Sequence, residues 1–307
     1  MTAAYAFALS AAHQAAADQH YPQGTLYVVA TPIGNLADIS LRALHVLALA
    51  DAIACEDTRH TQALLRAYGI DKAPSQLIAL HQHNEAQAAQ TVVQRLRQGQ
   101  RVACASDAGT PAISDPGARL VALVRGAGLG VMPLPGASSV AAAISVAGIV
   151  TNDDDASGFV FAGFLPSRSS EREAAVRTLS GEARSVVLLE APHRIEALAH
   201  ALAVLGERCV TVARELTKQF EEIATVRADE LPQWFADAPQ RTRGEFVLVL
   251  HPAAPVAGTG GAERILQLLL AELPLKTAVR LAADITGAPR NALYDAALAL
   301  KNRNADD

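Results

Sequence analysis

Short apolar runs alternate with helical patterns five times between residues 24 and 148. Each run has the length and β-branched content of a strand, and a polar loop and a helical pattern follow it. Because parallel strands need crossover connections, this alternation predicts a mostly parallel sheet that helices cover on both faces. The predicted strands are residues 24–30, 52–55, 77–80, 101–105 and 129–134.

A second series of strands and helices follows an acidic, polar linker at residues 151–158. Its predicted strands are residues 159–164, 185–189, 209–213 and 245–250, and its predicted helices are 172–179, 195–205 and 230–236. A second linker, rich in Pro, Gly and Ala, precedes three helices that suit a helix-turn-helix-like unit. These helices are residues 262–272, 275–286 and 290–300.

The predicted fold class is therefore α/β, with a mostly parallel first sheet, a mixed second sheet and a small helical extension. The first 23 residues are rich in Ala, His and Gln, which predicts a flexible extension, disordered or weakly helical, rather than a signal peptide. The predicted divisions are this extension over 1–23, α/β domains over 24–150 and 151–252, and the helical extension over 262–307.

Composition excludes several classes of protein. Of the 307 residues, 50% are hydrophobic and 19% are charged, which is typical of a globular protein of about two domains. The widely spaced Cys55, Cys104 and Cys209 predict reduced, buried thiols of a cytoplasmic protein, and no apolar run is long enough to span a membrane. A formal charge of −5 argues against general nucleic-acid binding but allows a local basic patch.

Polar loops follow the carboxyl ends of the first five strands, which share one edge of a parallel sheet, where such sheets bind ligands. One of them, A-S-D-A-G-T-P-A-I-S-D-P-G at residues 105–117, combines glycines and prolines in a shaped turn. Two interpretations of this loop stay open: a ligand-binding wall, or a tight turn in which Asp115 caps the next helix.

Several kinds of site are not supported by the residues. The chain has neither G-x-G-x-x-G after its first strand nor a phosphate-binding G-x-x-x-x-G-K-[ST]. His81, His83 and Glu85 have no partner loop to complete a metal site, so we predict no metal. Ser138 and Ser139 lack the G-x-S-x-G elbow of a nucleophile and are expected to cap the following helix.

Six motifs occur in a fixed order: T-P-I-G-N-L, E-D-T-R, S-D-A-G-T-P-A-I-S-D-P-G, L-P-G-A-S-S, E-A-P-H-R and A-R-E-L-T-K-Q-F-E-E. In this order they resemble the tetrapyrrole-methylase-like class of S-adenosylmethionine (SAM) methyltransferases, over about residues 24–250. Within that class they are similar to members that methylate the ribose 2′-hydroxyl of a cytidine in 16S ribosomal RNA, and the terminal helices resemble an extension of that subfamily. The resemblance implies a cytoplasmic homodimer, with SAM held in a cleft between two α/β domains.

The same resemblance implies a set of cofactor-binding residues. Main-chain groups in tight loops can bind the adenine edge and the methionine ammonium, and Asp107 can accept from a ribose hydroxyl or balance the charge of SAM. For each residue the alternative is a turn or a helix cap. The set is Pro32, Ile33, Gly34, Asp107, Ala108, Gly109, Ile113, Ala137, Ser138, Leu189, Ala213 and Gly244.

Methyl transfer to a ribose hydroxyl needs in-line geometry and removal of a proton. We do not rank the candidates for this base or orienting group on sequence alone. Lys218 either has a pKa lowered by burial, and so acts as a base, or pairs with Glu221 or Glu222 at the surface. The full set of candidates is Asp57, His83, Glu85, Glu190 and Lys218.

RNA contacts are predicted from two groups of cations. Arg59, Arg194 and Arg214 follow strand ends, where each either clamps the RNA backbone or forms a structural ion pair. In the tail, Lys276, Arg280, Arg290, Lys301 and Arg303 outnumber Asp284 and Asp295, which suits phosphate contacts or else an ordinary solvated bundle. Two alternative functions stay open: methylation of a small tetrapyrrole-type molecule, and a non-catalytic role in ribosome assembly.

Overall fold

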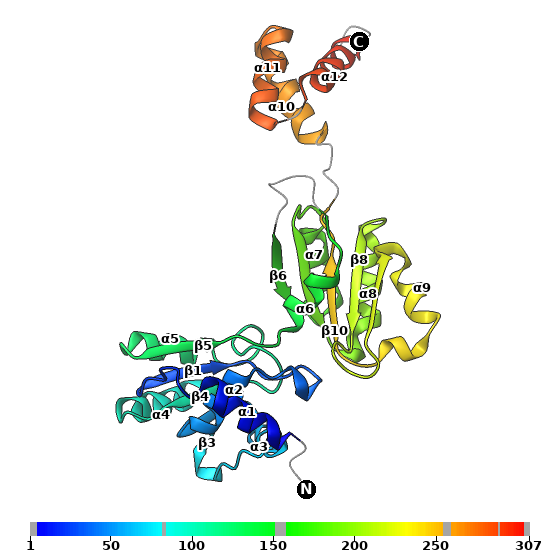
Figure 1. Cartoon of the computed structure of the whole chain (residues 1–307). Helices are drawn as coiled ribbons and strands as arrows, with labels where there is room; N and C mark the ends of the chain where they lie inside the picture. The colour runs from blue at the N-terminus through cyan, green and yellow to red at the C-terminus, as the bar shows by residue number, and fades with distance from the viewer. Residues whose placement is uncertain (1–4, 82–83, 151–157, 254–258, 288, 304–307) are drawn as a thin grey trace.

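The computed structural model describes residues 5–81, 84–150, 158–253, 259–287 and 289–303. Two α/β units, each built on a five-stranded sheet, are followed by three helices that form a separate bundle (Figure 1). The predicted fold class is confirmed: the first sheet is parallel, the second is mixed, and the end of the chain is helical.

The first sheet is wholly parallel, and its strands lie within two residues of their predicted bounds. Its central strands are fully buried because helices cover both faces. In spatial order the strands are β3 (Leu77–Ala79), β2 (Ala52–Cys55), β4 (Val102–Ala105), β1 (Thr25–Val29) and β5 (Gly130–Leu134).

Alternate residues of β1 supply the cores on the two faces of this sheet. Tyr27 and Val29 pack on one face, which is covered by α2 (Leu41–Leu49) and α3 (Thr58–Ala67). Leu26 packs on the other face, in the core that also holds the buried residues of two further helices. These helices are α4 (Glu85–Arg97) and α5 (Ala118–Gly126).

The N-terminal extension contains a packed helix, α1 (Ala6–Ala16). Ala12 and Ala16 are buried, and the Tyr5 amide donates to the Ala67 carbonyl at 3.1 Å. The prediction of a flexible extension is therefore wrong for this segment. Small alanine side chains let α1 pack closely against α2, and such contacts depend on the fold rather than on local sequence.

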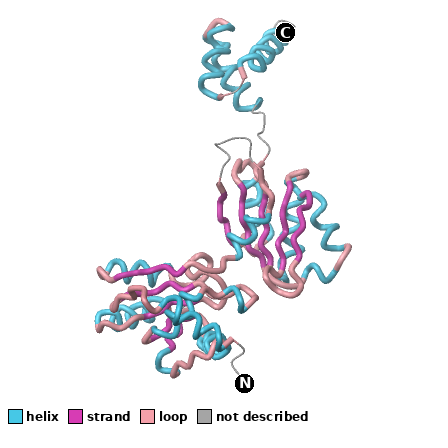
Figure 2. The backbone as a smooth tube through the Cα atoms, viewed as in Figure 1, coloured by secondary structure: helices cyan, strands magenta, loops and turns pink. Residues whose placement is uncertain are grey.

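The second sheet is mixed, because only β6 and β7 run parallel while its other neighbours are antiparallel. Its strands lie side by side in Figure 2. The sequence did not predict β9, an edge strand of alternating burial that begins at the last residue of the A-R-E-L-T-K-Q-F-E-E motif. In spatial order the strands are β6 (Phe159–Gly163), β7 (Ser185–Glu190), β10 (Phe246–Leu250), β8 (Cys209–Arg214) and β9 (Glu222–Arg227).

The helices on this second sheet place the domain boundary earlier than predicted. One face packs against α7 (Ser169–Leu179), α8 (Ile195–Leu202) and α9 (Leu231–Ala236). The other face packs against α6 (Ser139–Val146), which the prediction assigned to the first domain. Because α6 is apolar nearly all round, its sequence alone does not show which sheet it covers.

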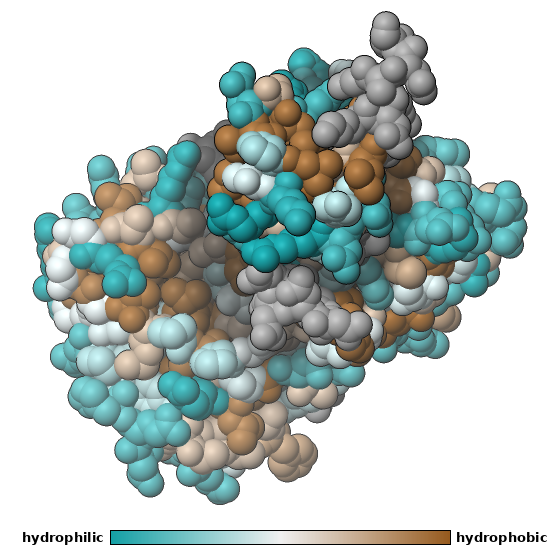
Figure 3. Space-filling view, turned by 90° about the horizontal axis from the view of Figure 1, so that it is seen from above, coloured by the Kyte–Doolittle hydropathy of each residue, from teal (hydrophilic) through white to brown (hydrophobic). Residues whose placement is uncertain are grey.

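The C-terminal bundle has a small core of its own. It consists of α10 (Thr259–Glu272), α11 (Leu275–Thr286) and α12 (Arg290–Arg303), packed around residues such as Leu266 and Leu293. Ile285 and Leu298 of the bundle are 61% and 42% exposed. Hydrophobic residues are visible on the outer surface of the bundle when the molecule is viewed from above (Figure 3).

Two predictions from composition can also be compared with the structure. Cys55 and Cys104 are buried as expected, whereas Cys209, at the start of β8, is exposed. Within the described ranges, no helix is both long and apolar enough to cross a bilayer.

Candidate functional site

Three loops of the first domain meet at the carboxyl edge of its sheet. Thr31 and Gly109 exchange two backbone hydrogen bonds of 2.9 and 3.0 Å, and the Thr110 hydroxyl donates to the Ala137 carbonyl at 3.0 Å. Gly109 has φ +80°, and a Cβ there would lie 3.2 Å from Ile33 Cγ2, so glycine suits both the conformation and the spacing. The predicted cofactor loops at 31–36, 106–113 and 135–139 are thus joined.

A loop of the second domain contacts the first of these loops. The Asn35 amide donates to Thr217 Oγ1 at 3.1 Å. A Cβ on Gly34 would lie 2.5 Å from Lys218 Cγ and 2.9 Å from Thr217 Oγ1, so only glycine permits this approach. Glu215 and Thr217 both have positive φ values, +52° and +67°, which are unfavourable for non-glycine residues. The contact connects the two domains beside a cleft.

The cleft between the domains has a volume of about 330 Å³, within the usual range for a small-molecule site. Its walls are mainly apolar, which suits the faces of a flat heterocycle. The predicted cofactor residues Ile33, Ala108, Leu189 and Ala213 all line it. The remaining lining residues are Ser139, Phe164, Glu190, Ala191, Pro192, Leu216, Glu245, Phe246 and Val247.

The other predicted cofactor residues lie in the supporting loops. Ser138 caps α6 by accepting from the Ala141 amide, which is the capping role that was expected of it. Asp107 accepts from the Asp57 amide at 3.3 Å, and Ile113 is 46% exposed on the same loop as Asp107. None of Ser138, Asp107 and Ile113 lines the cleft, and neither do Pro32, Gly34, Gly109, Ala137 and Gly244.

Sequence analysis missed several wall residues, most clearly Phe164, Leu216 and Phe246. Phe164 directly follows β6, and this position at the end of a strand could have identified it. Leu216 lies inside A-R-E-L-T-K-Q-F-E-E, in which only charged residues were considered as candidates. Phe246 begins β10, and its place beside the cleft depends on the antiparallel strand order, which the sequence did not specify.

The rim of the first domain is acidic. Asp57 caps α3 and pairs with Arg59 at 3.0 Å; hydrogen bonds from the Arg59 side chain, and then from its backbone, lower the pKa of Asp57 to about 2. Burial raises the pKa of Glu56 and of Asp115, and nearby carboxylates add to both effects. A carboxylate with so low a pKa is a poor proton acceptor, which argues against Asp57 as the catalytic base.

Glu85 has a structural role. Its buried Oε1 accepts from the amides of Gly117 and Arg119, at 3.1 and 3.2 Å, and so caps the start of α5. The interpretation of Asp115 as this cap is therefore wrong, because the N-cap residue is Gly117 and the capping carboxylate comes from α4. A base for the reaction would have to break this cap, so Glu85 does not suit that role.

Lys218 is held as a cation. Its Nζ lies 2.9 Å from Glu215 Oε1 and 3.0 Å from Glu245 Oε2. Burial lowers the pKa of Lys218, but hydrogen bonds to Glu215 and Glu245 outweigh it, and the net pKa is raised. The predicted lowered pKa is wrong, as are the predicted partners: Glu221 instead accepts from the Thr217 amide.

All three predicted RNA-binding arginines at strand ends form ion pairs, but only those of Arg194 and Arg214 are largely buried. Arg194 Nε lies 3.0 Å from Glu190 Oε1, and its Nη2 donates to the Leu165 carbonyl. The side chain of Arg214 is only 9% exposed; it pairs with Glu222 at 3.4 Å and donates to the carbonyls of Gln240 and Arg243, in the segment before β10. The structural alternative therefore applies to both, whereas the side chain of Arg59 is 91% exposed.

The cations of the C-terminal bundle remain near the surface. Arg280 and Arg290 share one carboxylate, Asp284, at 3.7 and 3.1 Å, and Lys276 is exposed. Two arginines against one carboxylate leave a local positive excess, as the sequence predicted. The side chains of Lys301 and Arg303, like the whole of His83, lie outside the described residues.

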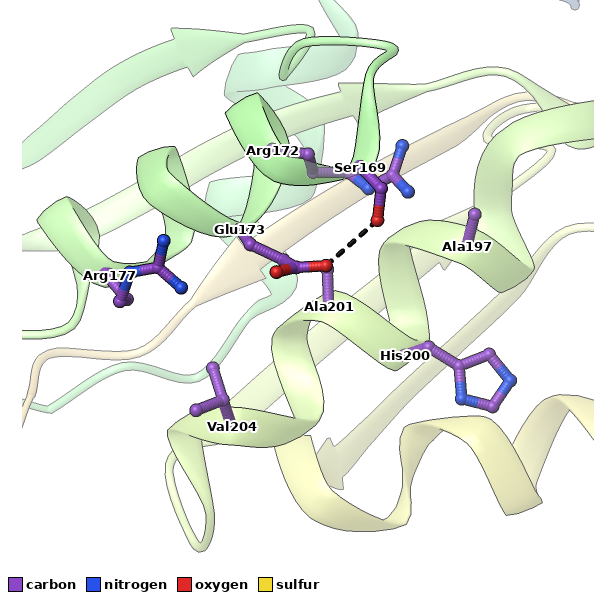
Figure 4. Close-up of a pocket in the computed structure, with 8 residues that line it drawn as sticks. All are labelled: Ser169, Arg172, Glu173, Arg177, Ala197, His200, Ala201 and Val204. Carbon is purple, nitrogen blue, oxygen red and sulfur yellow. Dashed lines mark hydrogen bonds between the residues drawn. The ribbon is translucent and has the colours of Figure 1, made fainter.

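A second cavity, of about 430 Å³, lies between α7 and α8 (Figure 4). In it the Ser169 hydroxyl donates to Glu173 at 2.9 Å, and Arg172 and Arg177 flank this pair. The cavity is lined only by residues of these two helices and the turn after them, and it includes no predicted site residue. Its mixed charges give no preference for one class of ligand, so the cleft between the domains remains the candidate site.

Comparison with known proteins shows the family of the chain. The family model described as Tetrapyrrole (Corrin/Porphyrin) Methylases matches residues 25–232. The chain belongs to this family. Its relatives include proteins named ribosomal RNA small subunit methyltransferase I. Those of Neisseria meningitidis serogroup A and Escherichia coli O157:H7 are 49% and 47% identical, over 91% and 90% of this chain and 95% of each relative.

The C-terminal helices of this methylase match a second model, described as the RsmI C-terminal HTH domain, over residues 256–301. Solved structures share the fold of the two α/β domains. The methyltransferase CobJ aligns with a TM-score of 0.54 at 19% identity, over 75% of this chain and 95% of that one. Cobalt precorrin-4 methyltransferase aligns with a TM-score of 0.53 at 19% identity, over 75% and 98%.

The donor set of this methylase offers little for a metal. Within the part of the chain that the structure describes, no three His, Cys, Asp or Glu side chains are grouped closely enough to bind one. The apolar cleft walls and the glycine-rich loops instead fit the adenosyl group of S-adenosylmethionine, the donor expected from the sequence.

Proposed function

We propose that this protein transfers a methyl group from SAM to the ribose 2′-hydroxyl of a cytidine in 16S ribosomal RNA. The observation that carries the proposal is the coincidence of two features. Five of the six family motifs supply residues that line one cleft between the domains, and relatives named ribosomal RNA small subunit methyltransferase I match 90–91% of the chain at 44–49% identity. The chain also matches the model of the RsmI C-terminal HTH domain over residues 256–301, whereas the solved cobalt precorrin-4 methyltransferase covers 75% of the chain.

The cleft residues would hold the donor by shape and by backbone contacts. When bound, SAM supplies an activated methyl group on a sulfonium. Ile33 and Ala108 of the first domain and Leu189 and Ala213 of the second would enclose its adenosyl part. The Gly34–Thr217 contact would keep the two walls at a fixed spacing.

Positioning, rather than a strong base, would provide most of the rate. Asp57 has a low pKa, Glu85 caps a helix, Glu190 is buried against Arg194, and Lys218 is held as a cation. Because a sulfonium is a good leaving group, in-line alignment of the ribose hydroxyl in a dry cleft lowers the barrier without a matched base. The acceptor's proton can leave to solvent at the rim.

RNA contacts would come from the exposed cations. Arg59 lies on the rim with its side chain 91% exposed, and Lys276, Arg280 and Arg290 lie on the C-terminal bundle. Guanidinium groups bind phosphates in bidentate fashion, and the bundle would add affinity without touching the cleft. A homodimer in the cytoplasm is part of the same proposal, and it rests on the family resemblance.

A methyl-transfer assay with nucleoside analysis tests the proposal. The protein is incubated with labelled SAM and either undermethylated small ribosomal subunits or a precorrin-type tetrapyrrole, and the RNA is digested to nucleosides. Label in 2′-O-methylcytidine is the expected result. Label in the tetrapyrrole alone would contradict the RNA substrate, and donor binding without transfer to either would indicate a non-catalytic protein.

Removal of residues 256–307 tests the role of the bundle. The truncated protein is expected to bind S-adenosylhomocysteine within about twofold of the full chain, while RNA methylation at limiting RNA falls by roughly tenfold or more. Equal loss of both would show that the bundle is structural and would contradict its assignment to RNA.

A further inference from the structure

Phe164 lines the cleft between the domains and is nevertheless 54% exposed. It follows the end of β6, the edge strand of the second sheet (Figure 1). The donor residues predicted from the same sheet, Leu189 and Ala213, lie instead on the interior strands β7 and β8. Phe164 therefore extends the cleft wall beyond the predicted donor residues, and its ring has surface free for a ligand.

A β-bulge near the end of β6 shifts its register against β7. The two strands pair residue by residue as far as Phe161, but the next pair skips Ala162 and joins Gly163 to Leu188. Gly163 has φ +64°, a left-handed conformation that glycine adopts without strain. Because β6 contains one extra residue at this point, the side chains that follow it change face.

The shift directs Phe164 into the cleft. Val160 and Ala162 pack in the core beneath the helices, and strict alternation would place Phe164 on that same face. Leu165 enters the core instead, where it is 6% exposed, and its carbonyl accepts from Arg194, which fixes the backbone beside the ring. The fold thus presents a large apolar side chain in the cleft, although burial in the core would be more favourable.

An unstacked nucleobase fits this exposed ring. A cleft of about 330 Å³ cannot admit a stacked RNA helix, so a reacting nucleotide must leave its stack, and an aromatic face stabilises a base that has done so. The neighbouring wall residues Ala191 and Pro192 carry no charge for a phosphate. We propose that Phe164 stacks against the base of the target nucleotide and so positions its ribose at the donor. This inference rests on the proposed methylation of RNA.

Kinetics of Phe164→Leu and Phe164→Tyr test the inference. Leucine keeps an apolar side chain but removes the aromatic face, whereas tyrosine keeps that face. With undermethylated small subunits as substrate and saturating SAM, kcat/KM for RNA should fall roughly 10-fold or more in the leucine variant and stay within about threefold of wild type in the tyrosine variant. Wild-type kcat/KM in the leucine variant, or equal losses in both variants, would overturn the proposal.

Donor binding distinguishes this role from a place in the donor wall. In calorimetric titrations, both variants should bind S-adenosylhomocysteine within about twofold of wild type, because the ring lies beyond the predicted donor residues. If the leucine variant loses donor affinity as strongly as it loses kcat/KM for RNA, Phe164 packs against the adenosyl group and the proposal is wrong.

Phe159→Leu is the matched control. Phe159 begins the same strand and is 48% exposed, but it does not line the cleft. This variant should keep wild-type kcat/KM and donor affinity, and a loss equal to that of Phe164→Leu would overturn the proposal. The wild-type protein separates the two proposals: no label in RNA would overturn the proposed function and this inference together. Labelled RNA with an unaffected Phe164→Leu variant would overturn the stacking role alone.

Discussion

The two domains differ in whether their carboxylates have cationic partners. On the rim of the first domain, Glu56, Asp107 and Asp115 lie near one another, and none has a Lys or Arg partner within 4.0 Å among the described residues. In the second domain, by contrast, buried or half-buried carboxylates are paired. The pairs are Glu190–Arg194, Glu222–Arg214 and Glu215–Lys218.

The pKa shifts record the same difference. Burial, with a smaller effect from Asp107, raises the pKa of Asp115. Burial also acts to raise the pKa of Glu215, but Lys218 and the Glu245 amide outweigh it, and the net pKa is lowered. Charge-rich motifs therefore have different roles in the two domains. In the second domain they form ion pairs that stabilise a wall of the cleft, and in the first domain they form an exposed acidic rim.

The largest expected effect comes from removing one ion pair of the second domain. Arg194→Ala leaves the buried Glu190 carboxylate without a counter-charge, and it should lower the free energy of unfolding by about 3–5 kcal/mol in urea denaturation. Arg59→Ala, which removes an exposed pair, should leave the unfolding free energy unchanged but weaken RNA methylation. Similar stability losses in both variants would contradict the comparison.

A smaller effect is expected at the helix cap. Glu85→Ala removes the acceptor for the Gly117 and Arg119 amides, which should cost about 1–2 kcal/mol of stability. The folded variant should still methylate RNA, because Glu85 is a cap in this account. Loss of methyl transfer without loss of stability would return Glu85 to the list of catalytic candidates.

The smallest expected effect is a pH-dependent change in stability when an unpaired rim carboxylate is removed. Because the pKa of Asp115 is raised in the folded protein, its ionised form opposes folding at neutral pH. Asp115→Asn should therefore raise the free energy of unfolding at pH 7 by less than about 1 kcal/mol. The gain should disappear below about pH 4, where the carboxyl is protonated in both folded and unfolded chains.

Glu215→Gln should show the opposite sign over the same range. The pKa of Glu215 is lowered in the folded protein, so its ionised form stabilises the fold above the unfolded pKa. The variant should be less stable than wild type at pH 7, and the difference should fade as pH drops through the folded pKa. Urea denaturation at several pH values measures both variants, and equal signs would contradict the contrast.

Much of the fold followed from local patterns. The alternation of strands and helices predicted the parallel first sheet, and α11 occupies its predicted residues. The failures share a physical cause. The packing of α1, the choice of sheet for α6 and the pairing of the edge strand β9 depend on contacts between segments distant in sequence.

The site divides along the same line. The sequence predicted Ile33 and Ala108 as cleft residues, because both lie in glycine-containing loops at strand ends that carry family motifs. The roles of charged side chains could not be predicted, because their partners are distant in the sequence. Glu85 caps a helix 32 residues away, and Lys218 pairs with Glu245, 27 residues away. Such pairings are fixed only by the folded chain.

The central claim is that the cleft between the two domains holds the methyl donor, and filling the cleft tests it directly. Ala108 lines the cleft from an exposed loop, so Ala108→Phe should occupy the adenosyl space without disturbing a core. Ala122→Phe, on the exposed surface of α5, is the control. We predict that calorimetry detects S-adenosylhomocysteine binding to wild type and to the control, and a loss of roughly 100-fold or more in Ala108→Phe. Unchanged affinity in Ala108→Phe would contradict the account.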